Sequence, residues 1–448
     1  MKLLRFMVNA EATASAASGL LADILRDDAF FPREPKRLEE TGLSATFVES
    51  LVLKYLLGVG SQAGRTVADR LGLNLTILEE IFRSLRTRQL ASHAGSAALN
   101  DYIYTLTDAG RETARAAMRT CAYVGPAPVP LDEYITSVHA QSVRGEPIRK
   151  KKLVEAFKGL VVDEAMFDNL GPAVNSGAGL FLYGFPGNGK TTLAKRITRC
   201  FGTDIWIPHA FVEDGQIVKL FDSSFHELRK SDAENSLIKS AGHDRRWAKI
   251  VRPTVVVGGE LTLDALDMRH DPTNNISEAP IQMKSNGGCL LIDDFGRQRV
   301  EPQALLNRWI VPLENRVDYQ TLANGKKIQV PFEQLIIFST NLDPADLADD
   351  AFLRRIPYKI EVEDPSLEEF RYLFQVFAKE LAIPFDEASV DDLVQRHYKP
   401  HGRPLRRCQP RDLLLQIRNY CTFHGLKPEM KPEWFDRAAK SYFTVVKG

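Results

Sequence analysis

One stretch, from Leu180 to Thr192, constrains the fold of this chain more than any other part of the sequence. Four apolar residues, Leu180 to Tyr183, predict a buried strand, and Gly-Phe-Pro-Gly-Asn-Gly-Lys-Thr-Thr follows directly, before a helical pattern that continues to Cys200. This is the complete G-x-x-x-x-G-K-[ST] pattern in the strand, loop and helix setting that it requires. Its glycines let backbone N–H groups turn inward around phosphate oxygens, and the helix N-terminus adds partial positive charge. We therefore expect a nucleoside triphosphate to bind to Gly184, Pro186, Gly187, Asn188, Gly189, Lys190, Thr191 and Thr192.

A second short apolar strand, Cys289 to Ile292, ends in the acidic pair Asp293 and Asp294. The carboxyl ends of parallel strands meet at one edge of a sheet, so Asp293 should lie beside the phosphate loop and hold Mg²⁺ together with the Thr191 hydroxyl. Lys190 would reach the β- and γ-phosphates. Asp294 would face water and act as the general base that polarises the attacking water. In the simpler alternative, the two acids only cap the next helix.

Composition excludes several classes of protein. The chain has 448 residues, 58 Lys plus Arg against 58 Asp plus Glu, and 44% hydrophobic residues, which is the balance of a globular protein and not of a disordered or fibrous one. At about 150 residues per domain, this length suggests roughly three folded units. A net charge of zero also means that the chain lacks the strongly basic composition typical of a nucleic-acid sheath.

The cysteines and the apolar runs indicate where such a chain would reside. No C-x-x-C pair is present, so neither a disulfide framework nor a zinc ribbon is encoded, and a reducing compartment fits best. No apolar run approaches the 18 or so residues of a membrane span, so we expect a soluble, cytoplasmic protein without membrane insertion. Met1 to Leu21 has some features of a signal peptide, but Arg5 and Glu11 interrupt its apolar part. The five cysteines are Cys121, Cys200, Cys289, Cys408 and Cys421.

The N-terminal region from Ser44 to Thr120 resembles a winged-helix domain. Three helical patterns are followed by two strand-like pieces around a small-residue loop, 94–99, and Asp108 is expected to cap a closing helix. Such a domain can bind DNA or dock a protein. Residues 44–120 carry nine Lys or Arg and seven Asp or Glu, and Glu79 and Glu80 lie on the presumed recognition helix, where phosphates would repel them. DNA binding is therefore possible but not favoured. The three helices are predicted over Thr46–Leu57, Thr66–Gly72 and Thr76–Gln89, and the strands over Leu90–His93 and Tyr102–Leu106.

These patterns define a plan of domains. The Pro-rich stretch Val124 to Pro130 cannot hold a helix and predicts a semi-rigid extended connector. Residues 1–43, with one possible helix around Ser18 to Arg26, show no clear core pattern. The plan is a lead-in (1–43), a winged-helix domain (44–122), a linker (123–150), an α/β ATPase domain (151–362) and a helical lid (363–448).

Further landmarks follow in a fixed order, and with them residues 150–440 resemble the AAA+ ATPase family. A strand-like run, Leu335 to Phe338, is followed by Asn341, which matches the sensor-1 residue that positions the attacking water. Ala351-Phe-Leu-Arg-Arg-Ile-Pro357 is similar to the arginine-finger segment, with Arg355 as first choice and Arg354 as second. Gln409-Pro-Arg-Asp-Leu413 opens a helix, and its Arg411 is similar to the sensor-2 arginine.

Each of these landmarks has a plainer interpretation. Asn341 could begin a turn, the two finger candidates could pair with nearby aspartates, and Arg411 could be an ordinary surface residue. The second motif also departs from the Asp-Glu of many members, because Asp294 holds its carboxylate about one methylene further back. Relatives among initiators and helicase loaders also use Asp-Asp, so hydrolysis remains expected, although slow turnover and a switch-like role become more plausible.

Two segments indicate which group of AAA+ ATPases the chain resembles. Asn324-Gly325 between strand-like pieces predicts a β-hairpin directly before the strand that leads to Asn341, which resembles the pre-sensor-1 hairpin group of MoxR-like chaperones and enhancer-binding proteins. About 100 residues separate Lys190 from Asp293, far more than the dozen or so that a parallel crossover needs. Within this insertion, Thr254 to Thr262 suggests another hairpin around a Gly-Gly turn, flanked by helices near Ser240–Lys249 and Ile276–Lys284.

We therefore expect an α/β fold: a P-loop three-layer parallel sheet with a helical lid, preceded by a winged helix-turn-helix domain. The resemblance implies ATP and Mg²⁺ as cofactors, hydrolysis at subunit interfaces and a homo-oligomer, most simply a six-membered ring. One function is an ATPase that remodels or assembles a protein complex recruited by the N-terminal domain. The alternative is an ATP-switched regulator or loader that holds DNA through the winged helix.

Overall fold

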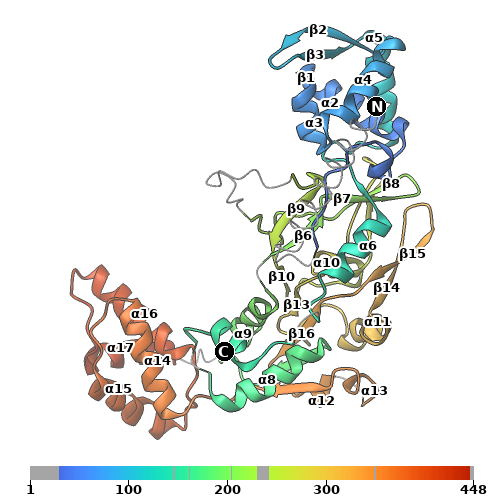
Figure 1. The fold of residues 1–448 in the computed structure, drawn as a ribbon. Coiled ribbons are helices and arrows are strands. Elements are labelled where there is room, and N and C mark those ends of the chain that lie inside the picture. The colour runs from blue at the N-terminus through green and yellow to red at the C-terminus, as the bar shows by residue number, and fades with distance from the viewer. Residues whose placement is uncertain are drawn as a thin grey trace, which may run out of the picture.

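The computed structural model describes residues 30–144, 147–160, 162–202, 204–229, 242–347 and 350–443. The predicted helix around Ser18 to Arg26 lies outside these residues, as does the start of the one predicted near Ser240. Figure 1 shows an elongated arrangement in which an N-terminal group of helices, a central region of sheets and a C-terminal group of helices follow one another. Among the described residues, no helix combines the length and apolar character needed to cross a bilayer.

The N-terminal module pairs a helical cluster with a small antiparallel sheet in the order β1-β3-β2. Ser44 accepts a hydrogen bond from the Phe47 N–H at the start of α2, and Asn74 accepts one from Thr76 at the start of α4. Thr107, and not the expected Asp108, caps α5, because the Thr107 hydroxyl reaches the Gly110 N–H. The elements are a 3-10 helix (Glu39–Thr41), α2 (Ala45–Val59), β1 (Ser61–Ala63), α3 (Gly64–Leu71), α4 (Leu75–Thr87), β2 (Ala91–Ala97), β3 (Asp101–Leu106) and α5 (Asp108–Thr120).

The loop predicted over residues 94–99 is largely strand. β2 continues to Ala97, and its register against β3 shifts between His93 and Gly95. A bulge interrupts the alternation of side chains along a strand, so a pattern of alternating polar and apolar residues does not predict that this segment continues the strand. β2 is an edge strand, since β3 is its only partner among the described strands.

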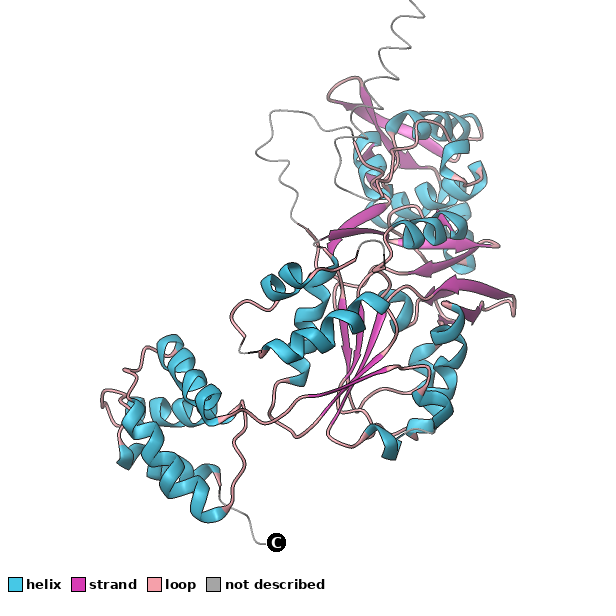
Figure 2. Ribbon diagram, turned by 60° about the horizontal axis from the view of Figure 1, so that its bottom comes forward, coloured by secondary structure: helices cyan, strands magenta, loops and turns pink. Residues whose placement is uncertain are grey.

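A five-stranded parallel sheet forms the centre of the molecule, in the order β10-β13-β16-β5-β17. Alternate residues of the strands face opposite sides, and each side packs on its own helices, which makes three layers. Figure 2 shows the fanned strands between the helices. The strands are β5 (Leu180–Tyr183), β10 (Thr254–Val257), β13 (Cys289–Ile292), β16 (Leu335–Thr340) and β17 (Tyr358–Glu361), and the helices are α7 (Lys150–Ala156), α8 (Glu164–Ser176), α9 (Lys190–Ile197) with a 3-10 turn (Thr198–Phe201), α11 (Pro302–Asn315), α12 (Pro344–Leu347) and α13 (Asp350–Leu353).

A second group of strands lies between the N-terminal module and the central sheet, and most of it comes from the insertion after α9. It shares one hydrophobic core with the hairpin β14–β15 and with α6. The elements are β4 (Val129–Pro130), α6 (Leu131–Ala140), β6 (Asp204–Pro208), β7 (Ala210–Glu213), β8 (Gln216–Lys219), β9 (Trp247–Val251), a 3-10 helix (Leu263–Leu266), β11 (Arg269–Asp271), β12 (Ile276–Glu278), α10 (Ile281–Lys284), β14 (Val317–Thr321) and β15 (Lys327–Pro331).

The structure corrects the prediction for residues 254–262. Thr254 to Val257 do not form a hairpin but the edge strand β10, which pairs in parallel with β13. The expected helix near Ser240–Lys249 is also wrong where the chain is described, since β9 begins at Trp247. Of the helix expected over Ile276–Lys284, only the four residues of α10 are helical, and β12 precedes them. A short apolar run before Gly-Gly is compatible with a strand of a hairpin and with a strand of a parallel sheet. The strand that pairs with Thr254 to Val257 begins more than 30 residues further along the chain, so the local sequence does not distinguish the two.

Residues 123–150, predicted to be a linker, are largely packed. Pro130 pairs in parallel with Val212, Tyr134 is 1% exposed, and the Tyr134 ring stacks on Phe211 with 5.4 Å between centroids. The Pro-rich stretch is extended as expected, but its end serves as strand β4 and leads into α6. Local sequence showed only that a helix is impossible at the prolines, and the insertion that covers this segment is formed by distant residues.

The N-terminal module rests on the insertion through a buried arginine and a close backbone contact. The Arg246 guanidinium, 2% exposed, binds Asp244 at 2.8 Å and donates to the Thr41 carbonyl at 2.8 Å. Beside it, a Cβ on Gly72 would lie 2.8 Å from the Arg245 carbonyl oxygen. The Arg245 side chain donates to the Leu73 carbonyl at 2.8 Å and pairs with Asp69 in α3.

The C-terminal helices enclose a hydrophobic core of their own. Ser366 and Glu369 form a capping box that starts α14. In Figures 1 and 2 this group stands apart from the central sheet and is reached from β17 by one loop. It comprises α14 (Leu367–Glu380), α15 (Glu387–Leu393), a π-helical turn (Val394–Tyr398), a 3-10 turn (Lys399–His401), α16 (Gln409–Phe423) and α17 (Pro432–Tyr442).

Candidate nucleotide site

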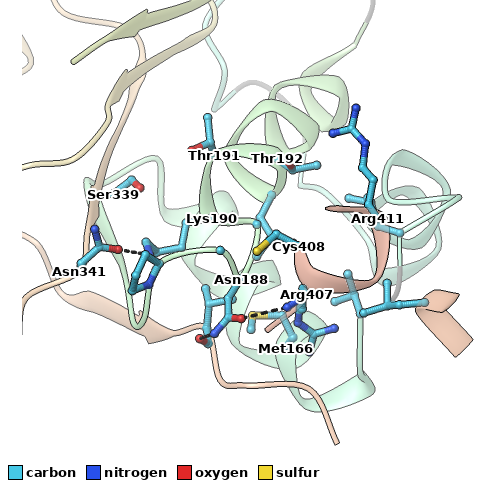
Figure 3. Close-up of a pocket in the computed structure, with 18 of the residues that line it drawn as sticks. Met166, Asn188, Lys190, Thr191, Thr192, Ser339, Asn341, Arg407, Cys408 and Arg411 are labelled. Carbon is cyan, nitrogen blue, oxygen red and sulfur yellow. Dashed lines mark hydrogen bonds between the residues drawn. The ribbon is translucent and has the colours of Figure 1, made fainter. Parts of the chain in front are cut away.

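A cavity of about 540 Å³ lies between the phosphate loop, the carboxyl edge of the sheet and the C-terminal helices (Figure 3). The predicted loop residues from Pro186 to Thr192 line it, together with Asp293, Asp294 and Asn341. The strand order explains this convergence, because β16 lies between β5 and β13 and so places Asn341 between the loop and the two acids.

The loop needs its glycines for both conformation and space. Gly184, Gly187 and Gly189 have φ values of +130°, +87° and +84°, a region that favours glycine. At Gly187 a Cβ would also lie 2.6 Å from the Cys408 Sγ, and at Gly184 one would lie 2.7 Å from the Val362 carbonyl oxygen. Gly189 is the N-cap of α9, so the helix N-terminus faces the cavity.

Lys190 is held at the centre of the loop. Its Nζ donates to the Gly184 and Phe185 carbonyls at 2.8 and 3.0 Å, and to Asn341 Oδ1 at 2.6 Å. Figure 3 shows Lys190 and Asn341 pointing toward each other. Burial lowers the pKa of the Lys190 ammonium from its ordinary value, and the nearby Asp294 and Asp293 carboxylates oppose that shift.

Thr191 and Asp293 meet as the sequence predicts, with 2.8 Å between Thr191 Oγ1 and Asp293 Oδ2. A hydroxyl and one carboxylate are hard oxygen donors of the type that Mg²⁺ takes when phosphates and water complete its shell, so these residues fit that ion. Within the described residues, no cluster of three or more His, Cys, Asp or Glu side chains could form an all-protein metal cage.

Asp294 turns away from the strand into the cavity. Its φ is +49°, a conformation that a non-glycine residue adopts infrequently, and its Oδ1 accepts a 3.3 Å hydrogen bond from Asn341 Nδ2. Asn341 therefore contacts both the lysine and the second acid.

The C-terminal helices are fastened to the loop by Asn188, whose side chain is 1% exposed. Asn188 Nδ2 donates to Asp364 Oδ1 at 2.7 Å, and Asn188 Oδ1 accepts from the Arg407 N–H at 3.3 Å. One residue earlier, the Gly187 carbonyl accepts from the Cys408 N–H at 2.9 Å. Asp364 also pairs with Arg406, whose guanidinium lies 4.2 Å from the ring centroid of Phe185. Residues on both sides of the α14 segment thus bind the loop.

Arg407 is a lining residue that sequence reasoning missed. Its side chain forms a 3.3 Å salt bridge with Glu369 and reaches the cavity near the loop. Two consecutive arginines directly before the α16 pattern were the signal available in the sequence. The apolar residues of the lining were also not predicted, and they include Leu160, Val162, Met166, Leu373 and Phe377.

The three predicted arginines differ in position. Arg411, exposed in the first turn of α16, lines the cavity, as does Thr192 (Figure 3). Arg354 and Arg355 do not line it. Arg354 is exposed, and Arg355 Nε donates to Glu314 Oε1 at 2.6 Å.

The parallel sheet, its strand order and the glycine-rich loop between β5 and α9 constitute a P-loop nucleoside-triphosphatase fold. A family model described as a domain of unknown function (DUF8689) matches residues 366–441, which are the C-terminal helices. A comparison with curated protein sequences finds no match.

Solved structures with partial similarity include NtrX from Brucella abortus, with 15% identity, a TM-score of 0.40, and coverage of 67% of this chain and 60% of that one. The Thermotoga maritima RuvB Holliday junction branch migration motor has 14% identity, a TM-score of 0.35, and coverage of 63% and 70%. This chain thus spans less than two thirds of NtrX. The fold assignment rests on the strand order and the loop, and not on these scores.

Proposed function

We propose that this chain is an ATPase of the AAA+ type that hydrolyses ATP at subunit interfaces to remodel or assemble a protein complex recruited by its N-terminal module. The observation that carries the proposal is the convergence of Lys190, Thr191, Asp293, Asp294 and Asn341 on one cavity. The hairpin β14–β15, which precedes β16, supports the comparison with the pre-sensor-1 hairpin group.

Different residues of the cavity would bind the base, the phosphates and the attacking water. The apolar lining residues suit a purine base, and the loop N–H groups and Lys190 suit the phosphates. Asp294 would accept a proton from the attacking water, and Asn341, which contacts Asp294, would orient that water. Mg²⁺, held by Thr191 and Asp293, would neutralise charge on the phosphoryl oxygens.

A further cation would come from a neighbouring copy. Since Arg355 and Arg354 do not line the cavity of their own chain, the proposal assigns them to the cavity of the adjacent subunit in a ring, most simply of six. An arginine supplied in this way can change kcat by about 10³ to 10⁵, so an isolated monomer should be nearly inert.

The winged-helix assignment of the N-terminal module is part of the proposal, supported by the order of its helices and by the β2–β3 pair. A DNA-associated regulator or loader is the second candidate, favoured by the exposed arginines Arg83 and Arg86 on α4. Glu79 and Glu80, exposed on the same helix, weigh against it. A cytoplasmic location is likewise proposed from the free cysteines among the described residues.

Two variants test the chemistry. Lys190→Ala should abolish binding of a fluorescent ATP analogue, whereas Asp294→Asn should retain binding and lose about 10²- to 10⁴-fold in hydrolysis, the usual contribution of a general base. If Asp294→Asn hydrolyses ATP at the wild-type rate, the assignment of the base fails.

A third variant tests assembly. Arg355→Ala should bind ATP normally, form the same oligomer in light scattering and lose hydrolysis. If this variant hydrolyses ATP at the wild-type rate, the assignment of Arg355 fails and Arg354→Ala tests the second choice. A wild-type protein that stays monomeric with ATP and still cleaves it rapidly would contradict the shared site.

A further inference from the structure

An arginine-lined groove of about 860 Å³ lies on the N-terminal module. None of the residues that line it lines the nucleotide cavity. It is formed by the last turn of α4, the beginning of β2 and the first turn of α5. Arg83, Arg86 and Arg88 contribute three cations, and among the described residues Asp108 is the only acidic one that lines the groove.

Two of these cations are available for a partner. Within the described residues, Arg83 and Arg86 form no salt bridge and are exposed, whereas Arg88 pairs with Glu49. Arg83 and Arg86 lie three positions apart on α4 and therefore share one face of the helix. Asp108, also exposed, lies 3.7 Å from Arg111 Nη1, which partly compensates its charge.

The groove also lies beside the edge of a sheet. Ala91, Ser92 and His93 of β2 line it, and β2 has a partner on one side only among the described strands. An edge strand presents N–H and C=O groups that an extended peptide can pair with, while side-chain pockets or charges beside the edge supply specificity.

We propose that this groove binds an acidic peptide segment in extended conformation, which adds to the β2 edge and places its carboxylates against Arg83 and Arg86. This inference rests on the proposed function, because it names the kind of partner that the N-terminal module recruits. Nucleic acid fits less well because charge along α4 is divided: Glu79 and Glu80 are exposed at its N-terminal half, so a duplex that follows the whole helix would meet them.

The test uses the full-length protein and a fluorescein-labelled decapeptide of alternating Glu and Thr, with binding followed by fluorescence anisotropy. The double variant Arg83→Glu/Arg86→Glu should weaken binding at least tenfold. Arg115→Glu/Arg119→Glu is the matched control, since these exposed arginines of α5 lie outside the groove, and it should change the affinity less than twofold. A peptide that is N-methylated at alternate residues should also lose at least tenfold, because it cannot pair with the edge.

Three results would overturn the inference: no binding of the decapeptide by the wild type, equal losses in the groove and control variants, or tighter binding of a 20-base-pair duplex that the groove variant abolishes. Lys190→Ala should bind the decapeptide as well as the wild type. Absence of ATP hydrolysis in the wild type would therefore refute the proposed function and leave peptide binding intact, so the two failures are distinguishable.

Discussion

Asn188 offers the sharpest test of how the C-terminal helices control the nucleotide site. Asn188→Ala removes the 2.7 Å hydrogen bond to Asp364 and the 3.3 Å bond from the Arg407 N–H. A hydrogen bond to a charged group contributes about 1.5–3 kcal/mol and a long neutral one less. Arg406 still pairs with Asp364 in this variant, so we expect the free energy that attaches the loop to the C-terminal helices to fall by about 2 kcal/mol, in the lower part of that range.

That loss shifts the attachment equilibrium by about 30-fold, since 1.4 kcal/mol corresponds to a factor of ten. A nucleotide that contacts both the loop and the C-terminal helices should then bind more weakly, by up to about 30-fold, which titration of a fluorescent ATP analogue measures. Asn419→Ala, an exposed asparagine on α16, is the matched control and should have no effect.

A double-mutant cycle with Asp364→Ala decides whether the pair is the cause. Residues in direct contact show non-additivity of about 0.5–3 kcal/mol, so Asn188→Ala should cost less affinity once Asp364 is absent. If the two substitutions are additive, or if Asn188→Ala binds like the wild type, the loop is not held by this contact and the reasoning is refuted.

Three further predictions follow from the same structure. Burial lowers the pKa of Lys190, so nucleotide affinity should be retained below that pKa and lost as the pH rises through it, at a lower pH than for an ordinary lysine. Lys190→Arg should remove this pH dependence. A parallel loss of affinity in both proteins would contradict the prediction. Asp293→Asn should weaken Mg²⁺ affinity in the nucleotide complex by about 10- to 100-fold in calorimetry, and an unchanged affinity would exclude Asp293 from the metal site. Tyr134→Ala should lower the free energy of unfolding by about 3–5 kcal/mol in denaturant titration, because Tyr134 is buried. Tyr372→Ala, which removes an exposed side chain, should change the free energy of unfolding by no more than about 0.5 kcal/mol. Equal effects of the two substitutions would mean that α6 does not belong to the folded core.

The strands that carry the site were predictable because their signals are local. Leu180 to Tyr183 and Cys289 to Ile292 form β5 and β13 with the expected bounds, since each is a fully apolar run that ends in residues unsuited to a strand. The meeting of Thr191 with Asp293 followed from a general property of parallel sheets. The role assigned to each site residue stays a prediction.

What could not be predicted depends on contacts between distant segments. Val129 and Tyr134 belong to a core completed by β6 and β9, and nothing in the Pro-rich sequence beside them indicates that partner. Arg407 reaches the cavity only because Asn188 and Asp364 hold the start of α16 against the loop. The sequence predicts Asp108 as the cap of α5, but Thr107 caps the helix; both residue types are good caps, and only the backbone geometry distinguishes them.

The firm seating of the N-terminal module has a mechanical consequence. Arg246 and Asp244 are buried beneath the module and Gly72 lies against the Arg245 backbone, so a displacement of the strands below would require the module to move with them or to lose these contacts. Val129, Tyr134 and Val138 lie in the same hydrophobic core as those strands, so the position of the N-terminal module is set by the fold and not by the length of a tether.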